Sequence, residues 1–169
     1  MQISERMILF TASLAMLVAC AERGPDAAKT TILTAATLGE QSILPVTEYL
    51  AAAPYADADL QNGERQAQVC RACHVFGEGG ANMLGPSLFG VFGAQSGSRQ
   101  GFEYSEALRS AGFTWTPRAL DAWLVQPGRF LPGNRMVFAG VSSSADRDDL
   151  IAYLLRATAV PTSGRGEST

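Results

Sequence analysis

Cys70, Cys73 and His74 lie within five consecutive residues, and His74 is the only histidine in the chain. A Cys-x-x-Cys-His run is the attachment motif for c-type haem. On a helical turn, residues three positions apart point the same way, so both thiols can form thioethers along one side of a porphyrin. His74 then follows beneath the iron, where its neutral imidazole can act as the proximal ligand. The spacing therefore predicts one covalently attached haem.

Other chemistries can use the same residues. A Cys-x-x-Cys pair also serves thioredoxin-like redox reactions, but these need a βαβ context that this sequence does not show. Zinc requires four ligands, and the domain has no Cys or His beyond Cys70, Cys73 and His74. A carboxylate could be the fourth ligand, but it would complete the site poorly. A chance match in an exported disulfide hairpin is the remaining alternative. We favour haem attachment over all three.

An electron-carrying haem iron needs a sixth ligand, and methionine is a common choice that raises the reduction potential. Three of the five methionines fall in the N-terminal export signal described below, which leaves Met83 and Met136. Met83 follows His74 closely on the loop that leaves the proximal side, where packing is the simpler role. Met136 lies in the turn-rich segment 132–138, which can wrap round the opposite face. We predict that Met136 is the second axial ligand.

The N-terminus carries an export pattern. The apolar run 7–18 is about a dozen residues long, shorter than the roughly 20 residues that span a bilayer but typical of a signal-peptide core. Leu17-Val18-Ala19-Cys20 resembles the lipobox of bacterial lipoproteins, in which cleavage precedes the cysteine and its sulfur receives a lipid. We predict a signal peptide over 1–19 and lipid attachment at Cys20. A simple cleaved signal and an uncleaved anchor are the alternatives, and all three place the domain outside the cytoplasm.

Helix signals indicate a small all-α domain over 59–158. Asp59 can cap a helix that runs to the haem motif, and Gly63 within it would allow a second helix to cross closely. The loops that follow are long and rich in glycine, and by themselves such loops are poor evidence for a compact domain unless a large apolar group provides the core that they wrap. A haem supplies that group.

The second half of the domain carries further helix signals. Thr116 can cap a helix that starts at Pro117 and ends before Pro127. Ser144 can cap the last helix, in which apolar residues recur on one face at positions 150, 154 and 157.

The remaining segments are a connector over 20–58 and a flexible C-terminal tail over 159–169. Stretches 31–38 and 43–50 are moderately apolar and could form short helices, which Pro45 and Pro54 would break. The connector is interpreted as a solvated spacer, with a docking segment for a membrane partner as the alternative.

Charge excludes one large class of function. The formal net charge of the 169-residue chain is −3, which gives no nucleic-acid signature. Lys29 is the only lysine, so basic contacts of the domain must come from arginine, which suits planar carboxylate partners.

Residues 60–158 resemble class I cytochrome c, of the mitochondrial and bacterial c2-like type. The segments 85–88, 101–105, 132–140 and 149–154 match the family's proline loop, propionate loop, methionine loop and C-terminal helix. The resemblance implies an all-α cytochrome c fold, with about four to five short helices and long loops wrapped round one covalent haem c.

The resemblance also implies roles around the haem. The carbonyl of Pro86 is the implied acceptor for the N–H of His74. Tyr104 and Trp115 are the implied hydrogen-bond donors to a buried propionate. Asn134 belongs to the matched methionine loop and is placed among the haem surroundings.

Three positions depart from the family pattern. Ala94 replaces an arginine common near the propionate, Leu108 replaces a polar residue near the haem, and Trp123 replaces a tyrosine often found near the methionine sulfur. Fewer hydrogen bonds to the propionate and the sulfur leave the reduction potential open but do not affect ligation.

These observations favour an electron carrier over an enzyme. By resemblance, a cytochrome bc1-like complex would be the donor and a terminal oxidase-like complex the acceptor, served by a periplasmic, membrane-anchored monomer. Arg71, Arg129 and Arg135 could steer an acidic partner in place of the family's lysine ring.

The sequence is also compatible with two other functions. A fixed subunit of a larger periplasmic dehydrogenase or oxidase is the main alternative, which the apolar connector favours. Catalysis or gas sensing at the haem needs an open sixth position, and Met136 argues against that.

Overall fold

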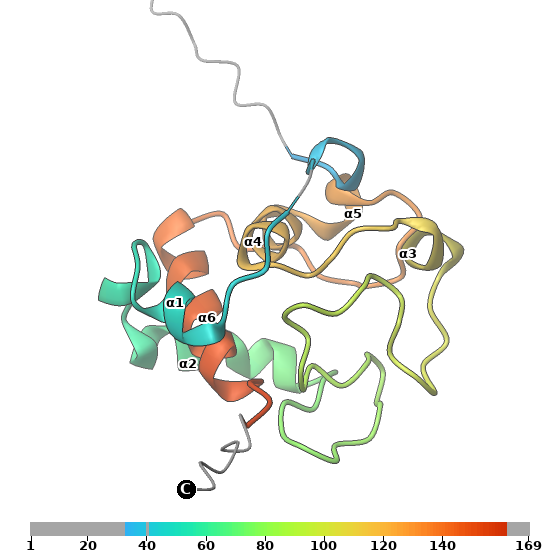
Figure 1. The fold of residues 1–169 in the computed structure, drawn as a ribbon. Coiled ribbons are helices and arrows are strands. Elements are labelled where there is room, and N and C mark those ends of the chain that lie inside the picture. The colour runs from blue at the N-terminus through green and yellow to red at the C-terminus, as the bar shows by residue number, and fades with distance from the viewer. Residues whose placement is uncertain (1–32, 40, 162–169) are drawn as a thin grey trace, which may run out of the picture. The chain divides into compact units, whose positions relative to one another are not determined.

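The computed structural model describes residues 33–39 and 41–161, which form helices and loops with no β-strand among them (Figure 1). Gln95 and Thr114 make one isolated antiparallel bridge. The all-α prediction is confirmed. The helices are η1 (Ala35–Thr37), α1 (Val46–Leu50), η2 (Tyr55–Asp57), α2 (Leu60–Arg71), α3 (Glu106–Ser110), α4 (Pro117–Val125), α5 (Pro127–Phe130) and α6 (Ser144–Ala157).

Helix α2 begins where the sequence predicts. The carboxylate of Asp59 accepts hydrogen bonds from the backbone N–H groups of Gln61 and Asn62, at 2.9 and 3.0 Å. These bonds satisfy two of the donors that a helix N-terminus leaves without intrahelical partners. The Asn62 amide also donates to Asp146 and Asp149, both at 2.8 Å, which ties the start of α2 to α6.

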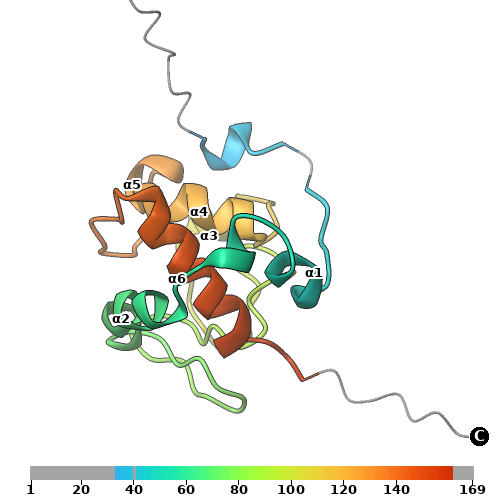
Figure 2. The ribbon, with the colours of Figure 1, turned by 90° about the vertical axis from the view of Figure 1, so that its left-hand side faces the viewer.

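Helices α2 and α6 pack against each other (Figure 2), and Gly63 of α2 lies where their backbones approach closely. A Cβ atom placed on Gly63 would lie 2.8 Å from the Cβ atom of Tyr153, and closer still to the Asp149 carbonyl. Only glycine allows this approach, which confirms the packing role predicted for it.

The second half of the domain follows its capping signals with one correction. The Thr116 hydroxyl accepts a hydrogen bond from the N–H of Ala119 at 3.1 Å, and Pro117 is the first residue of α4. Ser144 was the predicted cap of α6, but Ser143 caps it, accepting from the N–H of Asp146 at 3.2 Å. Adjacent serines make this boundary ambiguous in sequence, because either hydroxyl could reach a first-turn N–H.

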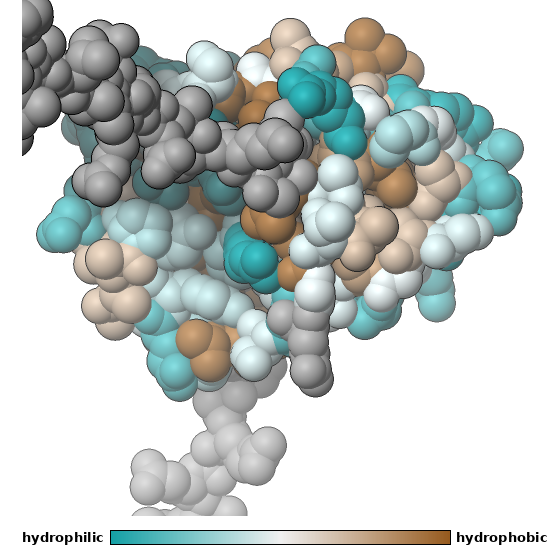
Figure 3. All heavy atoms as spheres, turned by 90° about the horizontal axis from the view of Figure 1, so that it is seen from above, coloured by the Kyte–Doolittle hydropathy of each residue, from teal (hydrophilic) through white to brown (hydrophobic). Residues whose placement is uncertain are grey.

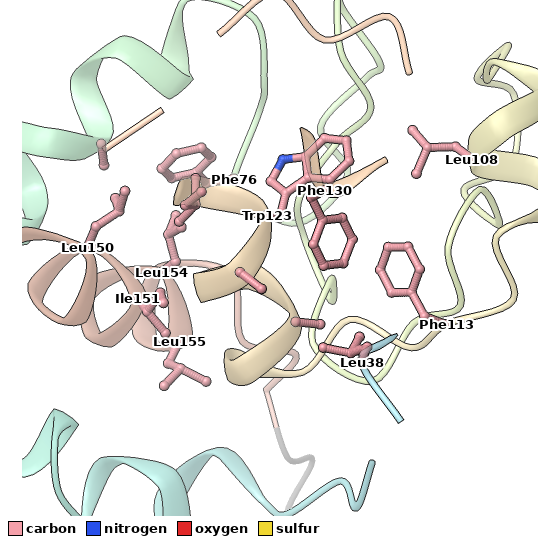
Figure 4. Close-up of a cluster of buried hydrophobic side chains, with 14 residues drawn as sticks. Leu38, Phe76, Leu108, Phe113, Trp123, Phe130, Leu150, Ile151, Leu154 and Leu155 are labelled. Atoms are coloured by element: carbon pink, nitrogen blue, oxygen red, sulfur yellow. The ribbon is translucent and has the colours of Figure 1, made fainter. Parts of the chain in front are cut away.

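The core joins α6 to a set of aromatic rings (Figure 4). Leu150, Ile151 and Leu155 of α6 are completely buried. Trp123 packs edge-to-face on Phe130 and on Trp115, with ring centroids 5.8 and 5.3 Å apart. Such pairs add stability beyond the area they bury and hold the rings in fixed orientations.

One ion pair connects α6 to α4. Arg147 is 8% exposed, and its Nε atom lies 2.7 Å from a carboxylate oxygen of Asp121. Its Nη1 atom donates to the carbonyls of Val141 and Ser142, at 2.9 and 3.0 Å. The charge is therefore hydrogen-bonded on several sides, as a buried arginine requires.

Part of the predicted connector packs against the domain. The side chain of Leu38 is 1% exposed and belongs to the core, and its carbonyl accepts a hydrogen bond from Arg118 at 2.7 Å. The predicted short helices appear as η1 and α1, with Pro45 directly before α1. A solvated spacer therefore does not describe residues 33–39. The domain boundary at 58/59 stays a prediction.

The chain between α2 and α3 contains no helix and forms the green-to-yellow loops of Figure 1. On the face shown in Figure 3, apolar residues occur in separate groups between hydrophilic ones. Across the described residues, no helix has the length and apolar character needed to cross a bilayer. The predicted signal peptide, Cys20 and most of the C-terminal tail lie outside the described residues.

Candidate functional site

A cavity of about 1180 Å³ lies between the end of α2, the loops that follow it, α4 and the segment 135–138. This volume exceeds the ~300–1,000 Å³ of most small-molecule sites, so the cavity suits a large group. Its walls are mainly apolar, with contributions from Leu88, Leu120, Trp123 and Leu154. Apolar walls keep water from a bound group and thereby influence its redox potential.

Helix α2 delivers the Cys-x-x-Cys-His motif to this cavity. The N–H groups of Cys73 and His74 both donate to the Cys70 carbonyl, at 3.1 and 2.9 Å, so the helical turn continues to the histidine. All three side chains line the cavity, and both thiols are free. Burial raises the pKa of the Cys70 thiol, which disfavours the reactive thiolate that thioredoxin-like chemistry needs.

The zinc alternative gains no support from the structure. Within residues 33–39 and 41–161, no group of three or more Cys, His, Asp or Glu side chains is arranged to hold a metal ion.

His74 is oriented by the carbonyl of Pro86. Its Nδ1 atom lies 2.7 Å from this oxygen, which can only accept, so Nδ1 carries the proton and Nε2 has a free lone pair. Burial lowers the pKa of His74, and the bond to Pro86 acts in the opposite direction. A neutral imidazole with one fixed N–H is the form that ligates iron.

The backbone beside His74 is shaped to fit the ring. A Cβ atom on Gly85 would lie 2.7 and 2.8 Å from the two ring nitrogens. The N–H of Gly85 donates to the Cys73 carbonyl at 2.9 Å, which holds this loop segment in place. Asn82 ties the same loop to the next one, accepting from Ser87 N–H at 2.9 Å and donating to the Gln100 carbonyl at 3.1 Å.

Met136 comes to the cavity from a loop that Asn134 organises. The Asn134 amide donates to the carbonyls of Pro127 and Leu131, at 2.9 and 2.8 Å, and its oxygen accepts from the N–H of Met136 at 2.9 Å. Met136 is partly buried and packs against the core, whereas Met83 is 51% exposed. Both methionines line the cavity and both have a hydrogen-bonded backbone N–H, but of the two only the Met136 side chain packs against the core.

Tyr104 and Trp115 each bring a hydrogen-bond donor to the same cavity. Tyr104 packs edge-to-face on Phe102 with ring centroids 4.8 Å apart, and Trp115 packs likewise on Phe113 at 4.7 Å. Burial raises the pKa of the Tyr104 hydroxyl, against a smaller opposing effect of the Arg99 backbone and charge. The hydroxyl therefore stays protonated and can donate a hydrogen bond.

The residues predicted from sequence converge with one exception. Asn134 does not itself line the cavity and acts on it through Met136, while Cys20 lies outside the described residues. A covalent, axially ligated haem fits this donor set, because the cavity combines two thiols, a histidine with a free Nε2, a methionine and hydrogen-bond donors. The cavity-lining predicted residues are Cys70, Cys73, His74, Pro86, Tyr104, Trp115 and Met136.

Sequence reasoning missed two contributors to the site. Asn82 holds two loops together through its side-chain amide, and Arg99 lines the cavity. Both stand in glycine-rich loops, where no periodicity indicates which side chains point inward. The only available signal was the scarcity of charged residues between Glu78 and Glu103, which leaves Arg99 alone in that stretch.

Comparisons with known proteins agree with this geometry. The chain is similar to cytochrome c from Chlamydomonas reinhardtii, with 46% identity over 102 residues that cover 60% of this chain and 91% of that protein. It is similar to cytochrome c2 from Blastochloris viridis, with 41% identity over 102 residues that cover 60% and 80% of the two chains. No family model matches the chain.

A solved structure shares the fold. Cytochrome cH from Methylobacterium extorquens superimposes with a TM-score of 0.54 and 41% identity, over 59% of this chain and 99% of that one. The shared part accounts for essentially the whole of the smaller protein, whereas this chain has additional residues.

Proposed function

Because this chain belongs to the cytochrome c family, whose members are electron-transfer proteins with one covalent haem c, we propose that it carries single electrons between redox partners outside the cytoplasm. The observation that carries the proposal is the convergence of His74 and Met136 on one cavity beside two cysteines. When bound, the haem supplies a one-electron couple at iron, with a potential set by axial ligands, hydrogen bonds and burial.

We assign the protein's contribution to named side chains. Cys70 and Cys73 would hold the porphyrin through thioethers, and His74 Nε2 and the Met136 sulfur would ligate the iron. Pro86 keeps the His74 ring in one tautomer through the 2.7 Å bond at Nδ1. The Asn134 bonds fix the Met136 backbone, which would hold this ligand in position.

Tyr104 and Trp115 are proposed to donate hydrogen bonds to a haem propionate. Both line the cavity, and aromatic packing holds each ring in place. A carboxylate that leaves water needs such donors, since an unpaired buried charge is costly.

Exposed arginines support an acidic redox partner. Arg71, Arg129 and Arg135 are exposed, and none of them forms a salt bridge within the described ranges. Arg71 donates to the Tyr153 hydroxyl at 2.7 Å and lies over the Phe76 ring, so its position is fixed. We propose that these three arginines attract acidic surfaces of membrane redox complexes, with a cytochrome bc1-like complex as electron donor and a terminal oxidase-like complex as acceptor. We further propose that the protein is a periplasmic monomer, anchored to the membrane through a lipid at Cys20.

The optical spectrum of the full chain, produced with haem-maturation machinery, tests the ligand assignment. We expect a covalent-haem spectrum with the weak far-red band of methionine-bound ferric iron. Met136→Ala should remove that band and allow carbon monoxide to bind, whereas Met83→Ala, the matched control, should retain it. Loss of the band in the Met83 variant alone would reverse the assignment, and absence of haem would overturn the proposed function.

A fixed subunit of a larger complex is the second candidate. Ile43 and Leu44 are 53% and 44% exposed, which places apolar surface on the segment before α1. Purification from native membranes distinguishes the two functions, since a stoichiometric partner that survives high salt supports a subunit. A carrier should leave the membrane complexes under the same conditions.

A further inference from the structure

Arg99 is a half-buried cation on the cavity wall. One of its guanidinium nitrogens donates to the Phe89 carbonyl. Within the part of the chain that the structure describes, the salt bridges are those of Arg65, Arg109 and Arg147, so Arg99 has no carboxylate there. A partly desolvated guanidinium is favourable only when an anion or several acceptors compensate it.

The surroundings of Arg99 indicate where that anion would sit. Tyr104, Trp115 and Ala94 line the same cavity. Burial raises the pKa of the Tyr104 hydroxyl, while a hydrogen bond to the Arg99 backbone and then the Arg99 charge lower it, so Arg99 and Tyr104 are neighbours on the cavity wall. Ala94 has a small side chain, which leaves this corner free for a longer side chain from a neighbouring segment.

We propose that the guanidinium of Arg99 binds a haem propionate together with Tyr104 and Trp115. The inference rests on the haem site proposed above. Arg99 thus provides, from a different position, the cation that the resemblance leads one to expect at Ala94. A planar guanidinium can contact both oxygens of a carboxylate, and one of its nitrogens is already fixed by Phe89.

Arg135 is the other arginine on the cavity, but it is a weaker candidate. It is exposed, and its guanidinium donates to the Glu103 carbonyl at the edge of the cavity. An exposed cation is screened by water and salt, so it should affect a propionate less than the half-buried Arg99 does. Arg135→Gln is therefore a matched control.

The inference predicts a change in redox behaviour. Removal of a positive charge beside the haem should lower the reduction potential, because the oxidised form carries more positive charge. The propionate pKa should rise by about 1–3 units, the usual effect of removing a neighbouring arginine. The other titratable groups on the cavity are His74, Glu103, Tyr104 and Arg135, beside the two cysteines.

Redox titration of the holoprotein between weakly acidic and weakly alkaline pH provides the test. We expect Arg99→Gln to lower the potential and to move its pH-dependent step upward, while Arg135→Gln stays near the parent. The double variant Arg99→Gln/Ala94→Arg should return the step toward the parent value. If Arg99→Gln fails to give holoprotein, Arg99→Lys is the substitute, because it keeps the charge but loses the planar contact. Its pH-dependent step in reduction potential should move upward by less than the step expected for Arg99→Gln.

Two results would overturn the inference and leave the proposed function intact. One is a pH profile of the reduction potential that is the same for the Arg99 variants as for the parent, when these variants also keep the parent optical spectrum. The other is a shift caused by Arg135→Gln and not by Arg99→Gln. Loss of covalent haem from the parent protein would count against the function itself.

Discussion

At Gly85 the backbone passes directly against the ring of His74. The space that a side chain would fill there is occupied by the imidazole, with ring nitrogens 2.7 and 2.8 Å from an ideal Cβ position. The same glycine donates to the Cys73 carbonyl, so it cannot move away without breaking a hydrogen bond. One absent methyl group therefore helps to hold a ligand in position.

Gly85→Ala should displace the His74 ring and weaken its bond to Pro86. We expect the variant to lose more than about 1 kcal/mol of unfolding free energy, in the range of overpacked sites, and to show an altered iron–ligand spectrum. Denaturant unfolding and the optical spectrum provide the measurements. Gly77→Ala is the control, because nothing lies within 4 Å of its ideal Cβ atom. Equal stability of the two variants would contradict the role of Gly85.

At the scale of elements, the close approach of α2 and α6 positions the haem motif. Gly63 removes the side chain that would separate the helices, and the Asn62 amide binds two carboxylates of α6. Since α2 ends at the Cys-x-x-Cys-His motif, the crossing fixes one end of the cavity relative to the core.

Gly63→Ala should force the two helices apart, although alanine is the better helix former. The expected loss is about 1–3 kcal/mol, the usual cost of overpacking. Gly128→Ala in α5 is the control, since its ideal Cβ atom meets nothing within 4 Å. Thermal unfolding of the holoproteins measures the difference, and a Gly63 variant as stable as the control would show that the helices can separate freely.

Leu38→Ala tests whether the segment before α1 belongs to the folded domain. Truncation of a buried leucine costs about 2–5 kcal/mol, so the variant should be clearly less stable. Leu44→Ala should have a much smaller effect, because Leu44 is 44% exposed. Unfolding of both variants in urea compares them directly. A small and equal effect at the two positions would mean that residues 33–39 contribute little to stability.

Capping and packing signals were readable from sequence to different extents. Asp59, Thr116 and Pro117 mark helix starts because each acts on a backbone N–H a few residues away. Leu38 gave no such signal, since its partners lie in distant segments of the chain. Arg99 could not be predicted either, because its loop has no periodicity to show which side chains point inward.

At the scale of the whole molecule, charge is arranged unevenly around α4 and α6. Asp121, Asp148 and Asp149 lie near one another, and Arg147 pairs with Asp121 alone. Burial and then the charge of Asp121 raise the pKa of Asp148, while Arg147 opposes them. The ionised Asp148 therefore destabilises the fold at neutral pH.

Asp148→Asn should stabilise the protein at neutral pH, by about 0.5 kcal/mol or less, the range of surface substitutions. The folded-state pKa lies above the ordinary value, so the folded protein takes up the proton first and the cost of ionisation disappears as pH falls through it. The gain should thus be full near pH 7 and vanish in acid, as measured by urea unfolding across pH.

Glu106→Gln provides a control of opposite sign. Hydrogen bonds from Ser110 and then Arg109 lower the pKa of Glu106, so its ionised form is favoured in the folded protein. This variant should be less stable than the parent at neutral pH, with the difference again lost in acid. A stabilising effect of Glu106→Gln would show that long-range charge, and not these local contacts, controls the response.

The burial of Leu38 also limits how far the folded domain could extend from a membrane anchor at Cys20. An anchor at Cys20 would leave only the twelve residues 21–32 between the lipid and the described part of the domain. A chain of that length spans at most about 40 Å when fully extended, little more than the diameter of a domain of this size. A carrier with so short a tether would meet its partners by lateral diffusion over the membrane surface, and would not cross the periplasm.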